Sequence, residues 1–182
     1  MIRSLAFITL ILFFPIIIFV VIIIVVSDGF PIFYKQKRIG KNNSHFYLHK
    51  FRTMKNNTPE VSTDLLKDPD NYYIKFGKIL RRFSIDEIPQ LLNIIKGEMN
   101  FIGPRPAYYK QYKLIKMRTE NNIHKLKPGI TGWAQINGRD QISDNTKVEL
   151  DKYYLLNKNI VLDVKILFYT IFKVILHKDL RE

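Results

Sequence analysis

The stretch LAFITLILFFPIIIFVVIIIVV, residues 5–26, decides how this chain is organised. Its 22 residues carry no charge, and only Thr9 and Pro15 interrupt the apolar run. As one straight helix the stretch would extend about 33 Å, enough to cross a bilayer core of about 30 Å. Pro15 lies at its centre, where a proline removes a helix hydrogen bond and kinks the helix. Two interpretations stay open: a kinked spanning helix, which hydropathy alone favours, or a helix that enters one leaflet, bends at Pro15 and returns.

The charge distribution indicates on which side of a membrane the rest of the chain lies. The 182 residues carry a net charge of +13, and Arg3 is the only charged residue before position 28. Four basic residues follow the apolar stretch at once: Lys35, Lys37, Arg38 and Lys41. Basic residues beside a membrane segment stay in the cytoplasm. We therefore divide the chain into a membrane helix, residues 1–27, and a cytoplasmic-face domain, residues 28–182.

The composition suits one compact unit and excludes some kinds of site. Apolar residues make up 47% of the chain, which is far from the composition of a disordered protein. The chain contains no cysteine, so disulfides and thiolate metal sites are excluded. A strong positive charge suits nucleic acid, an anionic membrane surface or a polyanionic substrate. The neighbouring apolar segment favours the membrane, so we expect membrane lipids and no nucleic acid as partners.

Short-range patterns predict an α+β fold that is predominantly helical. Ile32–Tyr34 and Phe46–Leu48 read as short strands around a polar turn at residues 40–44, which predicts a small β-hairpin. Residues 144–157 predict a surface helix. Residues 160–178 gather most of their polar side chains on one helical arc, which predicts an amphipathic helix. This last helix suits the membrane interface, with an ordinary core-facing helix as the alternative.

The stretch RRFSIDEIPQ, residues 81–90, carries the strongest chemical signal. It sets two adjacent carboxylates, Asp86 and Glu87, close to arginines. A carboxylate can attack phosphorus or hold a divalent metal, and guanidinium groups can clamp phosphate oxygens, so the pattern indicates phosphoryl chemistry. The alternative is a capping box that begins at Ser84, but Pro89 fits poorly in that register. A helix that begins near Asp86 tolerates Pro89 in its first turn and leaves the capping and catalytic roles both open.

Two further places carry cations suited to an anion. Lys50 and Arg52 lie two residues apart, on one side of an extended segment, although the same pattern suits a solvated strand edge. In GPRP, residues 103–106, prolines stiffen the backbone on both sides of Arg105. This stiffness lowers the entropy lost when the arginine binds an anion. A rigid loop without a binding role is the alternative.

Two weaker signals come from a turn and an acidic pair. The run Asn137-Gly138-Arg139 predicts a tight hairpin turn that presents Arg139. Asp68 and Asp70 form an Asp-x-Asp pair, which many nucleotide-sugar glycosyltransferases use to hold a metal. Asp70 is explained more simply as the N-cap of a helix from about Asn71 to Arg82.

Five motifs in chain order resemble those of a known family. From about residue 10 to residue 176, the chain is similar to the bacterial sugar transferases, the monotopic phosphoglycosyl transferases. The agreement of five separate motifs makes the match specific. They are FPIFYKQKRIG (residues 30–40), KFRTM (50–54), LRRFSIDEIPQ (80–90), KGEM (96–99) with GPRP (103–106), and PGITG (128–132) through NGR (137–139).

The resemblance implies an enzyme for the first membrane step of glycoconjugate biosynthesis. Such an enzyme moves a sugar 1-phosphate from a UDP-sugar to a polyprenyl phosphate, such as undecaprenyl phosphate, and releases UMP. Asp86 matches the family's nucleophile, which attacks the β-phosphorus and forms a covalent phosphosugar intermediate. Glu87 matches its partner, and both carboxylates are expected to lie at a Mg²⁺ ion.

The resemblance also assigns binding roles to several residues. Pro104, Arg105 and Pro106 match the family's nucleotide-contacting loop. By residue type, the expected phosphate ligands are Lys50, Arg52, Arg82, Arg105 and Arg139.

The membrane topology is a further implication of the resemblance. We expect a monotopic protein of the bacterial inner membrane, with a re-entrant helix bent at Pro15 and the catalytic domain on the cytoplasmic face. The chain departs from the family pattern at Phe14, where a serine commonly precedes the proline, and at Phe30, where a glycine commonly precedes Pro31. Neither change touches the chemistry.

Two other functions remain as alternatives. The first is a membrane-associated glycosyltransferase that holds its metal with Asp68 and Asp70 and releases UDP in place of UMP. The second is a non-enzymatic basic protein that binds anionic lipid. The sequence identifies neither the sugar nor the glycan, and it leaves open whether the chain forms a homodimer.

Overall fold

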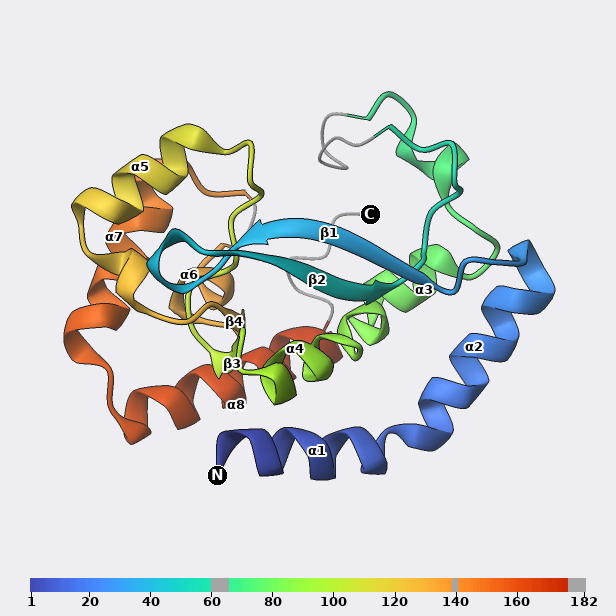
Figure 1. The fold of residues 1–182 in the computed structure, drawn as a ribbon, viewed down its shortest axis with the longest axis horizontal. Helices are drawn as coiled ribbons and strands as arrows, with labels where there is room; N and C mark the ends of the chain where they lie inside the picture. The colour runs from blue at the N-terminus through green and yellow to red at the C-terminus, as the bar shows by residue number, and fades with distance from the viewer. Residues whose placement is uncertain (60–65, 139–140, 177–182) are drawn as a thin grey trace.

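Two helices joined by a sharp bend form the N-terminal arm of the molecule. The computed structural model describes residues 1–59, 66–138 and 141–176, and Figure 1 shows its fold. The arm consists of α1 (Ile2–Leu12) and α2 (Phe14–Asp28), bent by 59° relative to one another. Pro15 lies in the first turn of α2, where its missing N–H costs no helix hydrogen bond. The bend predicted around Pro15 is therefore present.

The arm carries a large apolar surface. Among the described residues no single helix is long and apolar enough to cross a membrane, but the bent pair together has the length and composition of a broken span or a re-entrant loop. Exposed apolar surface of this extent marks a contact with lipid or with another protein. The exposed side chains of the arm include Phe7, Ile8, Leu12, Phe14, Phe19 and Ile22.

The predicted β-hairpin is confirmed and crosses the middle of the molecule (Figure 1). β1 (Phe33–Ile39) pairs antiparallel with β2 (His45–Phe51), in a register that places Phe33 opposite Phe51. A short 3-10 turn, η1 (Lys41–Asn43), joins the strands. Its Asn42 has a φ of 54°, in the left-handed region that asparagine tolerates.

A series of short helices follows the hairpin. They are η3 (Pro69–Tyr72), α3 (Gly77–Arg82), η4 (Ile85–Glu87) and α4 (Gln90–Lys96). α4 ends at Gly97, whose φ of 85° takes the chain out of the helix in a left-handed conformation.

The helix predicted from Asn71 to Arg82 is wrong over its first half. Tyr73 forms a β-bridge with Met54, and α3 begins only at Gly77. A Cβ on Gly77 would lie 2.0 Å from the carbonyl oxygen of Thr53, so only glycine allows the two segments to approach this closely. Pairing with a distant segment therefore overrides the local helical pattern.

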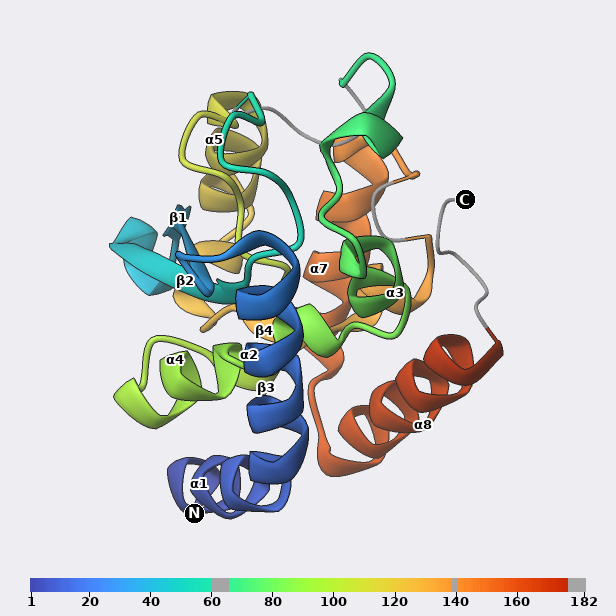
Figure 2. The same ribbon diagram turned by 90° about the vertical axis from the view of Figure 1, so that its right-hand side faces the viewer.

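The arm docks on the rest of the chain through its inner side. On α1, Ala6 is fully buried in a cluster that includes Ile94 of α4. On α2, Val20 and Ile24 are buried in a second cluster with Phe51 at the end of β2. Figures 1 and 2 show α1 alongside α4, so both ends of the bent arm lie against the same body.

The second half of the chain builds a small parallel strand pair that the sequence patterns did not predict. β3 (Asn100–Ile102) pairs with β4 (Gly129–Thr131), and α5 (Tyr112–Glu120) and η5 (Ile123–Lys125) lie between them in the chain. β4 leads into α6 (Trp133–Ile136).

The hairpin turn predicted at Asn137-Gly138 is wrong. Asn137 ends α6, and its side-chain amide donates to the Trp133 carbonyl at 2.7 Å. Asparagine often ends a helix in this way, so the local pattern was ambiguous. Arg139, which the turn was expected to present, lies outside the described residues.

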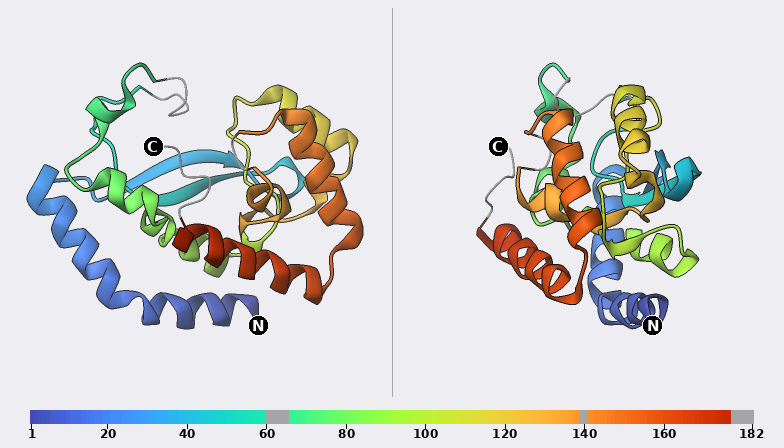
Figure 3. Two further views of the ribbon diagram at one scale, coloured as in Figure 1. Left: turned by 180° about the vertical axis from the view of Figure 1, so that it is seen from behind. Right: turned by 90° about the vertical axis from the view of Figure 1, so that its left-hand side faces the viewer.

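Two long helices complete the fold. They are α7 (Asp144–Asn157) and α8 (Ile160–Leu176), which confirm the two C-terminal helices over the described residues. In α8, Leu162 and Ile166 are buried against the core, while large apolar side chains on its other side, such as Phe168, stay exposed. Figure 3 shows α8 at the edge of the molecule. The helix therefore packs on the core and also presents apolar surface, and its position at a membrane interface stays a prediction.

Candidate active site

The two adjacent carboxylates lie in η4, a single 3-10 turn between α3 and α4. Ser84 precedes the turn with a φ of 55°, which ends α3 and redirects the chain. Asp86 is 4% exposed and Glu87 is 7% exposed. In the part of the chain that the structure describes, the Ser84 hydroxyl makes no capping hydrogen bond to the turn, so the capping-box interpretation is wrong.

Lys50 on β2 contacts both carboxylates. Its Nζ atom lies 2.8 Å from Glu87 Oε1 and 3.5 Å from Asp86 Oδ2. Two buried carboxylates side by side repel each other, and a shared ammonium offsets that repulsion. The Lys50 side chain is 15% exposed, so this contact is largely shielded from water.

Arg105 approaches the same pair from another element. Its loop, Gly103–Pro106, follows β3, and its Nη1 atom lies 3.8 Å from Glu87 Oε1. The Arg105 side chain is 28% exposed, so it is partly accessible from solvent. The structure thus brings together four of the predicted site residues, Lys50, Asp86, Glu87 and Arg105, from three separate segments.

Arg52 lies apart from this group, in a buried bonding network. It is 3% exposed, and its guanidinium donates to the Asp28 carboxylate at 2.5 Å and to the backbone carbonyl of Gly29 at 2.6 Å. These bonds tie the end of α2 to the end of β2. Its predicted role as a phosphate ligand stays a prediction.

Of the two remaining predicted phosphate ligands, Arg82 and Arg139, the structure describes only Arg82. Arg82 is exposed in the last turn of α3, and Arg139 lies outside the described residues. Their roles at a phosphate stay predictions.

The Asp-x-Asp pair does not form a cap on a long helix as predicted. Asp68 precedes η3, and Asp70 lies inside it, where its carboxylate pairs with Lys78 at 3.3 Å. The Asp70 side chain is 70% exposed. Within the described ranges there is no cluster of three or more histidine, aspartate or glutamate residues that would hold a metal.

Asp86 and Glu87 fit a Mg²⁺ ion that takes its other ligands from waters and substrate phosphates. Mg²⁺ prefers oxygen ligands, keeps several waters, and is commonly bound by one or two carboxylates together with substrate phosphates. The two adjacent carboxylates supply such oxygens, and Lys50 already marks a position where a cation contacts both.

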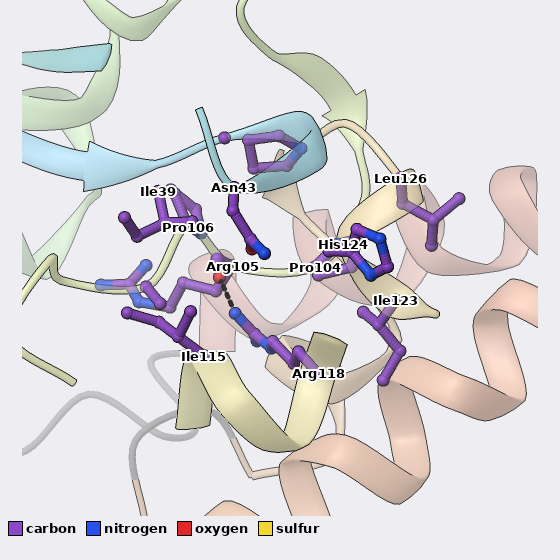
Figure 4. Close-up of a pocket in the computed structure, with 13 residues that line it drawn as sticks. Ile39, Asn43, Pro104, Arg105, Pro106, Ile115, Arg118, Ile123, His124 and Leu126 are labelled. Atoms are coloured by element: carbon purple, nitrogen blue, oxygen red, sulfur yellow. Dashed lines mark hydrogen bonds between the residues drawn. The ribbon is translucent and has the colours of Figure 1, made fainter. Parts of the chain in front are cut away.

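A small pocket lies against the backbone of the Arg105 loop, as Figure 4 shows. Its walls are mostly apolar and come from the loop, the hairpin turn after β1, α5 and η5. Neither Asp86 nor Glu87 lines it, so the pocket is not the centre of the carboxylate chemistry. Figure 4 also shows Arg118 pointing at the carbonyl of Arg105, to which its Nη1 atom donates at 2.8 Å.

The sequence patterns missed a residue that assembles the site. Asn93 on α4 is fully buried, and its side chain accepts from the His49 N–H at 3.1 Å and donates to the Tyr47 carbonyl at 2.8 Å and to Glu98 at 2.7 Å. It therefore joins α4 to β2, the strand that carries Lys50. A polar residue within the apolar run at 91–95 was the only available signal.

Comparison with known proteins identifies similar chains. The family model described as bacterial sugar transferase matches residues 3–177. An uncharacterized sugar transferase, EpsL of Bacillus subtilis, is 41% identical over 168 residues, which cover 92% of this chain and 81% of the relative.

Two relatives with stated activities are similar over a part of their length. The UDP-glucose:undecaprenyl-phosphate glucose-1-phosphate transferase of Escherichia coli is 36% identical over 184 residues, covering 96% of this chain and 39% of the relative. The UDP-N-acetylgalactosamine-undecaprenyl-phosphate N-acetylgalactosaminephosphotransferase of Aeromonas hydrophila is 35% identical over 175 residues, covering 91% and 40%. The two names give different sugars for similar chains.

Proposed function

The chain belongs to the bacterial sugar transferase family, and we propose that it transfers a sugar 1-phosphate from a UDP-sugar to undecaprenyl phosphate through a covalent intermediate on Asp86. The chain is an enzyme of the sugar-phosphate transferase class. The non-enzymatic lipid-binding alternative is therefore set aside. The observation that carries the proposal is the buried pair Asp86 and Glu87, contacted by Lys50 and approached by Arg105.

The first half of the reaction would load Asp86. A carboxylate oxygen of Asp86 attacks the β-phosphorus of the UDP-sugar, the bond from that phosphorus to the bridging oxygen breaks, and UMP leaves. Lys50 offsets the repulsion between the two carboxylates and the anionic donor. Arg105 stands on the Glu87 side of the pair, where its guanidinium would clamp a phosphate oxygen.

The second half would return Asp86 to its starting state. A phosphate oxygen of undecaprenyl phosphate attacks the same phosphorus, the acyl-phosphate bond breaks, and the lipid diphosphate sugar leaves. The carboxylate nucleophile thus divides one transfer between two anions into two steps. Mg²⁺ held by Asp86 and Glu87 would supply charge neutralisation at the diphosphate.

The acceptor requires a site close to a bilayer. We propose that the bent arm, α1 and α2, enters one leaflet of the bacterial inner membrane and returns, with the catalytic body on the cytoplasmic face. The exposed apolar side chains of the arm and of α8 support this arrangement, as does the docking of both arm helices on one body. The basic residues that follow α2 favour the cytoplasmic side.

The proposal is tested by the released nucleotide and by the intermediate. Purified protein is incubated with undecaprenyl phosphate, Mg²⁺ and a panel of UDP-sugars, and the nucleotide products are separated; we expect UMP with one or a few of the sugars. Release of UDP would support a glycosyltransferase that retains the diphosphate as product. Without the lipid acceptor, a peptide that contains Asp86 should gain the mass of one phosphosugar. An active enzyme without this adduct, or with the adduct on another residue, would contradict the covalent step.

A further inference from the structure

The backbone of the Arg105 loop depends on donors from outside the loop. Pro104 and Pro106 have no N–H group, so the loop cannot form the hydrogen bonds of an ordinary turn. Four consecutive carbonyls each accept a hydrogen bond from another element instead. The donors are Gly129 N to Pro104 O at 3.0 Å, Arg118 Nη1 to Arg105 O at 2.8 Å, Arg38 Nη1 to Pro106 O at 3.0 Å, and Ile39 N to Ala107 O at 2.9 Å.

The donor to the Arg105 carbonyl is a buried guanidinium. Arg118 lies on α5 and is 8% exposed. Its Nε and Nη2 atoms donate to Asp151 Oδ2 of α7 at 3.0 Å and 2.6 Å, and Asp151 is 1% exposed. The planar guanidinium therefore bonds a carboxylate along one edge and the loop carbonyl with its remaining Nη1 atom.

We propose that Arg118, held by Asp151, is a positioning residue that sets Arg105 opposite Glu87 for binding the donor phosphates. The inference rests on the proposed function. Arg118 bonds the backbone carbonyl of Arg105, the residue whose side chain faces the carboxylate pair. A shift of the Arg118 guanidinium would therefore move the backbone from which the Arg105 side chain extends. A displacement of about 1 Å at such a group is enough to lower turnover about 100-fold.

The geometry of the pair favours this role over a contribution to stability alone. A buried ion pair pays a desolvation cost that its attraction often only balances, and well-packed apolar residues commonly serve stability as well. A guanidinium differs from an apolar side chain, and from lysine, because it can bond two acceptors in fixed directions. The feature that only arginine supplies here is the bond to the Arg105 carbonyl.

The test is a double-mutant cycle with Arg118→Lys and Arg105→Ala. Arg118→Lys keeps the charge beside Asp151 but loses the planar guanidinium that bonds both Asp151 and the Arg105 carbonyl. We expect it to raise KM for the UDP-sugar and to lower kcat/KM for UMP release at least tenfold, with less than a twofold further loss when it is added to Arg105→Ala. Equal losses in the presence and absence of the Arg105 side chain would show that Arg118 acts independently of Arg105 and would overturn the proposal.

A second readout does not depend on activity. Hydrogen exchange of the backbone N–H groups of Gly129 and Ile39, which donate to the carbonyls of Pro104 and Ala107, should be faster in Arg118→Lys and in Asp151→Asn than in the parent protein. The matched control is Tyr154→Phe, which removes the hydrogen bond that the buried Tyr154 of α7 donates to Asp163 at 2.7 Å and should leave exchange of these two N–H groups and kcat/KM unchanged. Unchanged exchange in both pair variants would overturn the positioning role even if the protein released no UMP. Absence of UMP release from the parent protein, with faster exchange in the variants, would instead count against the proposed reaction.

Discussion

Lys50 Nζ lies 2.8 Å from Glu87 Oε1, so a strand of the hairpin and the turn before α4 meet at one ion pair. The two residues are 37 positions apart in the chain. The hairpin, α4 and α1 of the arm pack around the same buried cluster. The positions of Asp86 and Glu87 therefore depend on all three elements.

Lys50→Met should remove most of the activity. The substitution keeps the length of the side chain but leaves two buried carboxylates without the ammonium that contacts both, and the anionic donor then meets uncompensated charge. We expect UMP release to fall about 100-fold or more. Lys50→Arg, which keeps the charge, should retain more activity than Lys50→Met. Comparable activity in Lys50→Met and the parent enzyme would show that Lys50 takes no part in the reaction.

Removal of Mg²⁺ should stop the reaction without unfolding the protein. Asp86 and Glu87 supply only two protein carboxylates, so the ion would depend on the substrate phosphates for part of its coordination. We expect excess chelator to abolish UMP release and added Mg²⁺ to restore it, while the circular dichroism spectrum stays the same. Full turnover in chelator would argue against a metal at the carboxylate pair.

Asn93→Leu should destabilise the fold. The leucine has a similar volume, but it leaves the His49 N–H and the Tyr47 carbonyl without their side-chain partner, and buried unsatisfied groups cost about 1–3 kcal/mol each. We expect the free energy of unfolding to fall by about 2–4 kcal/mol in chemical denaturation. Asn157→Leu is the matched control, because Asn157 is exposed and makes one local hydrogen bond, and it should change stability little. Equal effects of the two substitutions would contradict the role assigned to Asn93.

His49 should titrate below its ordinary range. Partial burial lowers its pKa from the usual 6.5, and the nearby charges of Lys96 and Lys35 lower it further. The folded chain then binds fewer protons than the unfolded chain, so the contribution of His49 to stability is present above about pH 6.5 and is lost as the pH falls below that value. An NMR titration should give a pKa below 6.5 for His49 and a higher value in Lys96→Ala. An unchanged midpoint in Lys96→Ala would show that Lys96 has no such effect.

The sequence predicted the features that depend on neighbouring residues. The hairpin follows from the strand patterns around a polar turn, the bend from Pro15, and the chemical pair from Asp86 and Glu87 standing together among cations. These signals are local, so a single sequence contains them.

The features that the sequence did not predict depend on distant segments. β3 and β4 have three residues each and pair across 26 intervening residues, since β3 ends at Ile102 and β4 begins at Gly129. Tyr73 pairs with Met54 and so shortens the predicted helix. The bonds from Arg118 to Asp151 and to the Arg105 carbonyl join residues that are far apart in the chain, and no sequence motif connects them.

The last prediction concerns the topology of the N-terminal arm. Ala6 is fully buried against the body near α4, and a Cβ on Gly97 would lie 2.2 Å from a guanidinium nitrogen of Arg3, so the first turns of α1 pack closely on the end of α4. A helix that spanned the bilayer would carry Arg3 and Ala6 to the opposite face and break both contacts. We therefore expect the N-terminus and the catalytic body to lie on the same, cytoplasmic side.

Single cysteines test this topology, because the chain has none of its own. Ile2→Cys and Lys41→Cys are labelled in intact cells with a membrane-impermeant thiol reagent, and we expect both positions to react only after the cells are opened. Labelling of position 2 from outside, with position 41 protected, would establish a spanning helix. Pro15→Leu supplies the backbone N–H that a continuous helix needs at this position and favours a straight helix about 40 Å long, so it should expose position 2 to the outside reagent while position 41 stays protected. If Pro15→Leu leaves position 2 protected, the docking of α1 on α4, and not the proline, holds the arm in its bent form.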